Sequence, residues 1–414
     1  MSSKNLSLKI VFRIAFLLTF IFVMNETNGQ QTVEGLHFAT GKPVQIEIQN
    51  GKILKIIDIE KLSDASNNLI VAPGFFDNQI NGFAGVSFSF GGGELTEEGV
   101  KKATKALWER GVTSYLPTLT TNSGEVLTKN FSILAKVKDD EDLLGSIPGY
   151  HLEGPYISPI DGYRGAHSKR FVRLPDWKEF MEFYSAAGKN IITVTVAPEI
   201  EGAMEFIKKC TDLGIVISLG HHNGTAQQIN EAVKNGAKTC THLGNGCANM
   251  INRHDNPLWA QLANDGLMIS IICDGFHLRP EEIRTFSKAK GYNKTIITSD
   301  VTSYAGLKPG IYKNIDGDDI ELTVDGKIQY PAQQVLAGSA SSIDKGIGHA
   351  MKVTGCTLAE AIGMASANPA KLYGLTDRGV LEVGKRADLV LLSVEDYVLN
   401  VQKTYVKGEL VFEK

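Results

Sequence analysis

The sequence has few cysteines, and their spacing fits neither of the uses that cysteines commonly serve. Five Cys are spread through apolar segments, and no Cys-x-x-Cys pair occurs among the 414 residues. An odd number at this chain length argues against the disulfide framework of small secreted domains. The missing pair also argues against a zinc ribbon, whose metal is held by paired thiolates. We interpret most of these cysteines as buried apolar residues.

An excess of positive charge is also missing. Lys and Arg together number 42 against 46 Asp and Glu, which gives a formal net charge of −4. Proteins that bind nucleic acid along its backbone need clustered cations to neutralise phosphates. The composition therefore disfavours a nucleic-acid partner.

The chain has no apolar run long enough for a comfortable membrane span, which needs about 20 residues. The clearest apolar run is IAFLLTFIFVM (14–24), which follows three basic residues and precedes small residues near Gly29. This order is typical of a secretory signal peptide over residues 1–29. We expect an exported protein, periplasmic or extracellular, without membrane attachment once the peptide is removed. An uncleaved N-terminal anchor is the alternative.

A repeated pattern of short apolar run, turn and amphipathic stretch fills the middle of the chain. The apolar runs are residues 74–81, 113–121, 147–156, 192–199, 215–222, 238–245, 267–277 and 295–302. Strands that alternate with helical patterns indicate parallel βα units. Eight such units predict an α/β protein with a (β/α)8 TIM barrel, which we place at residues 73–374.

Both ends of the chain differ from the middle. Residues 30–72 and 375–414 are rich in alternating β-forming residues with Asn-Gly and Lys-Gly turns. We expect the two ends to pair into one small β-sandwich domain beside the barrel.

Polar side chains stand where the predicted strands end, and these ends form the face of a barrel that acts on substrate. They are Gln79, Asn81, Glu153, His221, His242, Asn245, Asp274, His277 and Asp300. A carboxylate such as Glu153 is costly within an apolar strand unless it is paired or binds a metal. Two imidazoles and one carboxylate at one mouth predict a hydrolytic metal site with a position left for water. Asp300 is placed across the mouth to move the proton of that water.

Ordered motifs extend this reading over nearly the whole mature chain. They are APGFFDNQING, HLEGPY, LGHHNGT, THLGNG, CDGFHL, SDVT, LAGSA and MASANPAKLYGL…GVLEVGKRADLVLL. The set closely resembles the N-acetylglucosamine-6-phosphate deacetylases of the amidohydrolase superfamily. The resemblance implies metal-dependent removal of acetate from an N-acetylated amino sugar. It implies Glu153, His221 and His242 as metal ligands.

The same resemblance implies further roles. Asp300 would be the catalytic acid and base, and His167 would help to polarise the acetyl carbonyl. The sugar phosphate would be held by Asn245, the backbone of Gly246, Arg253 and His277. Arg253 would reach into the neighbouring subunit of a homodimer.

Two departures from other amidohydrolases bear on the number of metal ions. Many members carry His-x-His on strand 1 and a carboxylated Lys on strand 4, whereas this chain has DNQIN and TVTVAPE there. We therefore expect one divalent ion. Zinc is our first expectation, and Fe, Mn or Co also suits a carboxylate with two imidazoles. The run THLGNGCANM also departs from the common family form, which leaves the details of the sugar pocket open.

Three alternatives stay open at this point. A phosphorylated sugar is normally an intracellular metabolite, so an exported enzyme could act on an unphosphorylated or otherwise substituted N-acetylhexosamine. An N-acyl amino-acid or cyclic-amide hydrolase would use the same barrel. An exported sugar-binding protein that has lost catalysis is the third.

Several polar residues also have structural interpretations. We expect His222 and His151 to be structural, and Asp274 to form a turn before Gly275. Gln79 would either touch the metal region or hydrogen-bond to a ligand.

Overall fold

A computed structural model describes residues 31–63, 68–89, 94–314, 316–331 and 335–414. The predicted signal peptide, residues 1–29, lies outside this part of the chain. Among the described residues, no helix has the length and apolar character needed to cross a bilayer.

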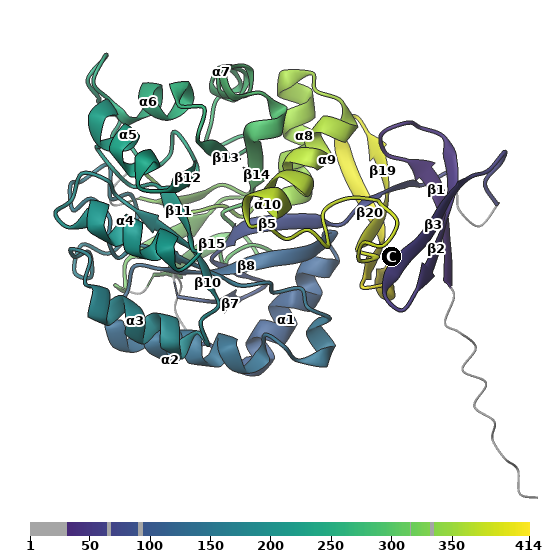
Figure 1. The fold of residues 1–414 in the computed structure, drawn as a ribbon, viewed down its shortest axis with the longest axis horizontal. Helices are drawn as coiled ribbons and strands as arrows, with labels where there is room; N and C mark the ends of the chain where they lie inside the picture. The colour runs from purple at the N-terminus through teal and green to yellow at the C-terminus, as the bar shows by residue number, and fades with distance from the viewer. Residues whose placement is uncertain (1–30, 64–67, 90–93, 315, 332–334) are drawn as a thin grey trace, which may run out of the picture.

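The predicted barrel is confirmed (Figure 1). Its parallel strands are β5 (Phe75–Ile80), β8 (Val112–Thr120), β9 (Tyr150–Glu153), β10 (Ile191–Val196), β11 (Val216–Leu219), β12 (Ala237–Cys240), β13 (Met268–Ile272) and β14 (Thr295–Thr298). They follow one another in sequence order around the sheet. A bridge between Ile80 and Val301 joins the first strand to the segment after the last, so the sheet nearly closes.

Amphipathic helices surround the barrel and cover its apolar outer face. They are α1 (Glu97–Trp108), α2 (Gly124–Val137), α3 (Trp177–Ala186), α4 (Ala203–Asp212), α5 (Ala226–Lys234), α6 (Pro257–Ala263), α7 (Pro280–Lys290), α8 (Ile343–Thr354), α9 (Leu358–Met364) and α10 (Ala367–Leu372). Local sequence sets their ends: Thr225 caps α5 in a reciprocal capping box with Gln228. The main apolar core lies between these helices and the strands, with Leu152, Val194 and Ile217 fully buried.

A seven-stranded sheet forms from the two ends of the chain. Its strands are β1 (Gln31–His37), β2 (Pro43–Gln49), β3 (Lys52–Asp58), β4 (Ile70–Pro73), β19 (Leu389–Glu395), β20 (Val398–Val406) and β21 (Glu409–Glu413). In space β4 lies between β1 and β19, and thus joins the two chain ends. A bridge from Lys52 to Arg386 brings the edge strand β3 back toward the segment before β19. The folded-over sheet encloses its own apolar cluster, with Ile46 and Leu389 fully buried.

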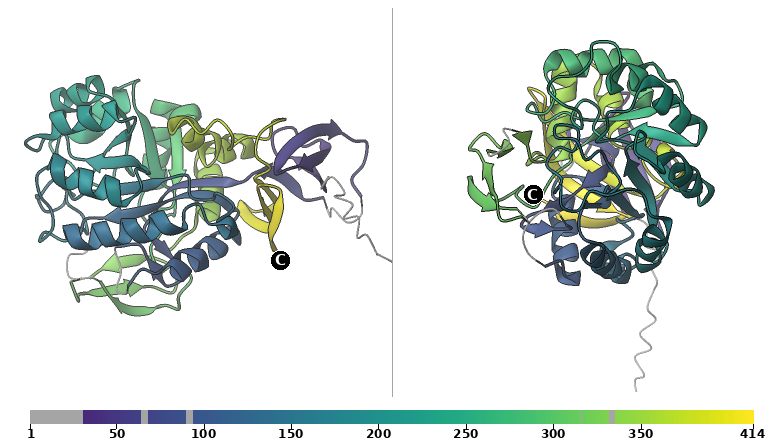
Figure 2. Two further views of the ribbon diagram at one scale, coloured as in Figure 1. Left: turned by 60° about the horizontal axis from the view of Figure 1, so that its bottom comes forward. Right: turned by 90° about the vertical axis from the view of Figure 1, so that its left-hand side faces the viewer.

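The sequence reading did not separate a small four-stranded sheet that is inserted between β14 and α8. It consists of β15 (Gly310–Lys313), β16 (Asp319–Leu322), β17 (Ile328–Tyr330) and β18 (Val335–Leu336). The two views of Figure 2 place it on the flank of the barrel, away from the seven-stranded sheet. A hairpin of β6 (Gly82–Phe83) and β7 (Val86–Ser87) follows the first barrel strand.

Candidate metal centre and substrate pocket

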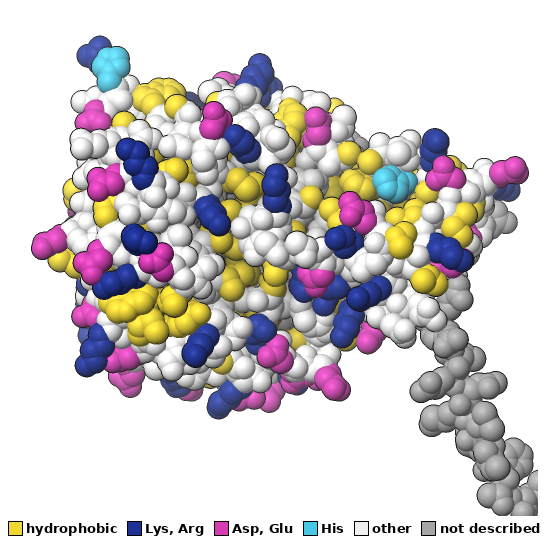
Figure 3. All heavy atoms as spheres, in the orientation of Figure 1, with side chains coloured by type: hydrophobic (Ala, Val, Ile, Leu, Met, Phe, Trp, Pro, Cys, Tyr) yellow, Lys and Arg dark blue, Asp and Glu magenta, His cyan; other side chains and the backbone are white. Residues whose placement is uncertain are grey.

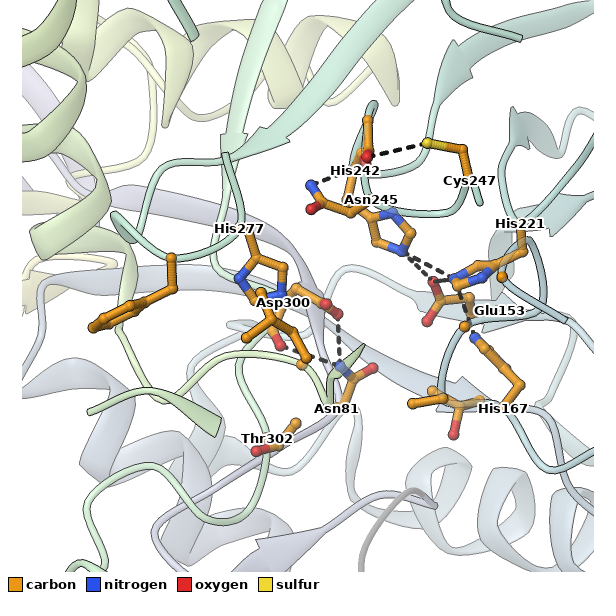
Figure 4. Close-up of a pocket in the computed structure, with 18 of the residues that line it drawn as sticks. Asn81, Glu153, His167, His221, His242, Asn245, Cys247, His277, Asp300 and Thr302 are labelled. Carbon is orange, nitrogen blue, oxygen red and sulfur yellow. Dashed lines mark hydrogen bonds and ion pairs between the residues drawn. The ribbon is translucent and has the colours of Figure 1, made fainter. Parts of the chain in front are cut away.

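A cavity of about 400 Å³ opens where the barrel strands end. This volume lies within the range of small-molecule sites. Most of the residues that the sequence singled out line it: Glu153, His167, His221, His242, Asn245, His277 and Asp300. Figure 4 shows Glu153, His167, His221 and His242 pointing toward one another, with Asn81, His277 and Asp300 on the other side.

Three of the residues at the pocket leave their strands through a left-handed backbone conformation. His221, His242 and Asp300 have φ of 52°, 27° and 51°, and each lies two residues beyond its strand. Residues other than glycine rarely adopt this region, and such strained backbone is common at functional sites. Glu153 needs no such turn, because it is itself the last residue of β9.

Glu153, His221 and His242 form a buried group whose donor atoms lie within 4.8 Å of one another. Nε2 of His221 and Nε2 of His242 lie 3.3 Å and 3.0 Å from Oε1 of Glu153, and 3.1 Å from each other. The Nδ1 of His221 donates to the backbone carbonyl of Tyr163 at 3.1 Å. Because a carbonyl oxygen only accepts, this bond places a proton on Nδ1 and leaves Nε2 as the nitrogen that can bind an ion in the group. The arrangement fits one divalent cation bound by two imidazoles and one carboxylate.

Gln79 links the candidate metal group to the candidate proton carrier. Its Nε2 donates to Oε1 of Glu153 and to Oδ1 of Asp300, both at 2.9 Å. Asn81 donates to the same Asp300 oxygen at 2.7 Å. Gln79 thus hydrogen-bonds to a candidate ligand, which was one of its two open interpretations. The amide groups at the end of β5 therefore donate to carboxylates, at the place where many amidohydrolases have a histidine pair.

The pKa values of the two carboxyl groups of the site are shifted in opposite directions. Burial opposes charge on Glu153, but the adjacent imidazoles of His221 and His242 hold its pKa well below its usual range. Burial raises the pKa of Asp300 to about 6, against the opposing charge of His242. A carboxyl group with a pKa near the working pH can both accept and return a proton.

His167 lies in the loop between β9 and α3, beside the candidate ligands. Its Nδ1 is 2.8 Å from Oγ1 of Thr121, and its Nε2 is 3.2 Å from Nε2 of His221. Burial lowers the pKa of His167 to about 3, so the ring is neutral. A neutral imidazole at this place can donate one hydrogen bond to a substrate oxygen.

The residues predicted to hold the sugar phosphate are distributed unevenly. Asn245 and His277 line the cavity. Gly246 packs against His221, where a Cβ atom would lie 2.7 Å from the His221 backbone nitrogen. Arg253 is exposed in the loop before α6 and lies outside the cavity lining. That loop projects from the barrel beside α6 (Figure 1).

Sequence reasoning missed other residues of the cavity wall, among them Thr302, Arg279 and Glu282. Arg279 is an exposed cation two residues after His277, and this proximity was the available signal. The structural interpretations of two histidines agree with their surroundings. His151 lies 2.7 Å from Oγ1 of Thr195, and Nδ1 of His222 accepts from the Gly224 nitrogen. Burial lowers the pKa of each to about 4.

The surface seen in Figure 3 carries cations and anions side by side rather than in a field of one sign. The five cysteines, all within the described part of the chain, are free, and four of them are buried. The face in Figure 3 and the cysteines therefore offer no second candidate site beside the cavity.

A nearly closed parallel barrel with a buried Glu–His–His group at its mouth is typical of a barrel hydrolase, and comparison with known proteins agrees. Residues 70–411 match the Amidohydrolase family. An N-acetylglucosamine-6-phosphate deacetylase of Danio rerio is 33% identical over 385 residues, which cover 89% of this chain and 92% of the relative.

Solved structures of two further proteins resemble this chain along most of its length. The N-acetylglucosamine-6-phosphate deacetylase of Thermotoga maritima has a TM-score of 0.81 and 32% identity, covering 93% of this chain and 100% of that one. A variant of the Mycobacterium smegmatis deacetylase, solved with N-acetyl-D-glucosamine-6-phosphate, has a TM-score of 0.82 and 26% identity, covering 92% and 99%. The chain belongs to the amidohydrolase family and, within it, to the N-acetylglucosamine-6-phosphate deacetylases, hydrolases that act on amide bonds.

Proposed function

We propose that the protein hydrolyses N-acetylglucosamine-6-phosphate to glucosamine-6-phosphate and acetate. One observation carries this proposal: a cavity of suitable size brings a Glu–His–His group and a buried Asp together in a chain of this family. The curated relatives carry the name of this deacetylase, and one solved neighbour holds this sugar phosphate.

We assign one divalent ion to Glu153, His221 and His242. Their donor set suits zinc first, with Fe, Mn or Co as alternatives. When bound, such an ion polarises an amide carbonyl and increases the acidity of water. Gln79 and Asn81 support a single ion. Their NH₂ groups face Glu153 and Asp300, and an NH₂ group cannot serve as a ligand to a second metal ion there.

The side chains then divide the proton transfers. Asp300 accepts a proton from the attacking water as the new C–O bond forms at the acetyl carbon. It returns this proton to the sugar nitrogen as the C–N bond breaks, so acetate and the amine leave. His167 donates a hydrogen bond to the acetyl oxygen, where negative charge develops. Gln79 and Asn81 hold the Asp300 carboxylate in place.

We assign the sugar phosphate to Asn245, the Gly246 backbone, His277 and the Arg253 of a neighbouring subunit. The position of Arg253, exposed and outside the lining of its own cavity, is compatible with a contribution across a homodimer. Arg279 supplies a further cation at the wall within the same subunit.

We also propose export through the N-terminal segment, with an uncleaved anchor as the alternative. Mass spectrometry of the purified native protein would identify its first residue. Export would make an unphosphorylated N-acetylhexosamine a reasonable second substrate.

The decisive experiment measures acetate release from N-acetylglucosamine with and without a 6-phosphate. We expect a much higher kcat/KM for the phosphorylated sugar. Equal or faster turnover of the plain sugar would remove the phosphate from the proposal and from the roles of Arg253 and His277. N-acetyl amino acids serve as the control for a different amide hydrolase.

A further inference from the structure

The turn that follows β13 contains a carboxylate with more bonds than a turn needs. Oδ1 of Asp274 accepts from the backbone nitrogens of Phe276 and His277, both at 2.9 Å. Oδ2 of Asp274 lies 2.7 Å from Nδ1 of His277. The predicted role of Asp274 as a turn residue accounts for Oδ1 alone. The second oxygen is directed at a residue of the substrate pocket.

The two side chains of this pair are buried, so a charge on Asp274 must be desolvated. The side chains of Asp274 and His277 are only 4% and 5% exposed. Burial opposes ionisation of Asp274, yet the charge and hydrogen bonds of His277 hold its pKa at about 2. An Asn or Ser would form the same kind of turn without desolvating a charge. The carboxylate therefore needs an explanation beyond the turn.

The bond to Asp274 determines which ring nitrogen of His277 is available to a ligand. A carboxylate only accepts, so Nδ1 must carry a proton and donate it to Oδ2. Nε2 is then the nitrogen left for the cavity, which His277 lines. Figure 4 shows the ring beside Asp300 and across the cavity from His167. A ring free to rotate could present either nitrogen there.

We propose that Asp274 is a positioning residue that fixes the proton and the orientation of His277, so that Nε2 of His277 binds the sugar phosphate. This inference rests on the proposed function, because it takes the ligand of the cavity to be the amino-sugar phosphate. Asp274 itself need not touch the substrate.

Asp274→Asn tests this proposal with little change in shape. The Asn oxygen can still accept the two backbone bonds, so the turn and the melting temperature should be kept. The new NH₂ group faces Nδ1, which must then accept and lose its proton. We expect the ¹⁵N shifts of His277 to report an Nδ1 that has lost its proton and an Nε2 that carries one. We expect KM for N-acetylglucosamine-6-phosphate to rise by about tenfold or more, with a smaller change in kcat.

Two further variants make the test specific. Asp176→Asn changes another Asp whose side chain accepts from a backbone nitrogen, the N-cap of α3, and should leave KM and the His277 shifts unchanged. In a His277→Ala background, Asp274→Asn should have no further effect on KM, because its effect passes through the imidazole.

The outcomes separate this inference from the proposed function. Unchanged KM and an Nδ1 that keeps its proton in Asp274→Asn would overturn the positioning role, as would an effect that persists without His277. A wild-type enzyme that releases no acetate from the sugar phosphate would instead contradict the proposed function. The His277 shifts would still decide the role of Asp274 in that case.

Discussion

Single residues at the pocket perform several tasks at once, and Asp300 is the clearest example. It stands in a left-handed conformation, accepts hydrogen bonds from Gln79 and Asn81, and has a pKa raised by burial to about 6. If Asp300 carries the proposed proton transfer, an amide of the same shape cannot replace it.

We expect Asp300→Asn to lower kcat by about 10²- to 10⁴-fold, the usual contribution of general acid–base catalysis. Metal content should stay near wild type, because the three candidate ligands remain. His221→Ala, by comparison, should lose both metal and turnover. Acetate release and elemental analysis of the purified variants measure the two effects. Full activity of Asp300→Asn would disprove the role assigned to it.

Gly246 provides a second test, of how closely the chain packs against the candidate ligand His221. A methyl group there would lie 2.7 Å from the nitrogen and 3.0 Å from the Cα of His221, so Gly246→Ala must shift a candidate ligand. We expect a reduced metal affinity, measured by titration with a competing chelator. Gly363→Ala in α9 is the matched control, since nothing lies within 4 Å of its added methyl. Equal affinities in both variants would contradict the close packing at Gly246.

The sequence indicated the kinds of residue at the site better than their contacts. Glu153, His221 and His242 could be found because polar groups at apolar strand ends are costly without a partner. The bridge that Gln79 makes could not, since no pattern shows which two carboxylates lie next to an amide after folding. The turn at Asp274 was predicted, but its second bond to His277 depends on a side-chain direction that spacing does not specify.

At the scale of elements, a buried carboxylate joins the first and last strands of the barrel. Asp77 in β5 accepts from Oγ1 of Thr298 at 2.9 Å and from the Ser299 nitrogen at 3.1 Å, at the end of β14. Burial raises the pKa of Asp77 to about 6 from an ordinary 3.8, although these bonds act in the opposite direction. The folded protein therefore binds this proton more tightly than the unfolded chain.

The resulting stabilisation is complete below about pH 4 and is lost as the pH rises through about 6. The shift corresponds to roughly 3 kcal/mol. Asp77→Asn has no charge to desolvate and keeps an acceptor oxygen. We expect the free energy of unfolding of the variant, relative to wild type, to increase by roughly this amount from acid to neutral pH. Urea unfolding of both proteins with a chelator present measures it, and a difference independent of pH would refute it.

The elements themselves followed closely from periodicity. Each of the eight apolar runs covers a barrel strand, apart from the first residue of β8, β10 and β12. Thr225 is the N-cap of α5, as its side chain predicts. The sheet of β15–β18 was missed for a physical reason. Its Asp-Gly turns indicate hairpins, but the short strands pair only among themselves, so the local pattern does not show where these hairpins lie relative to the barrel.

At the scale of the whole molecule, Arg253 lies outside the cavity of its own subunit, so its proposed role requires a second subunit. We expect Arg253→Ala to raise KM for the phosphorylated sugar and to leave turnover of the plain sugar unchanged. If Arg253 serves a neighbouring site, a mixed dimer with Asp300→Asn regains one complete site. Coexpression with two affinity tags isolates this dimer. Activity no higher than in either parent variant would refute the contribution across subunits.

The position of β4 has a consequence for synthesis. This strand pairs with β1 on one side and with β19 on the other, so the seven-stranded sheet interleaves the beginning and the end of the chain. A growing chain can pair β1, β2 and β3 early, but the free edge of β4 stays open until about three hundred residues later, when residues 389–395 leave the ribosome. The part of the molecule begun first is therefore completed last.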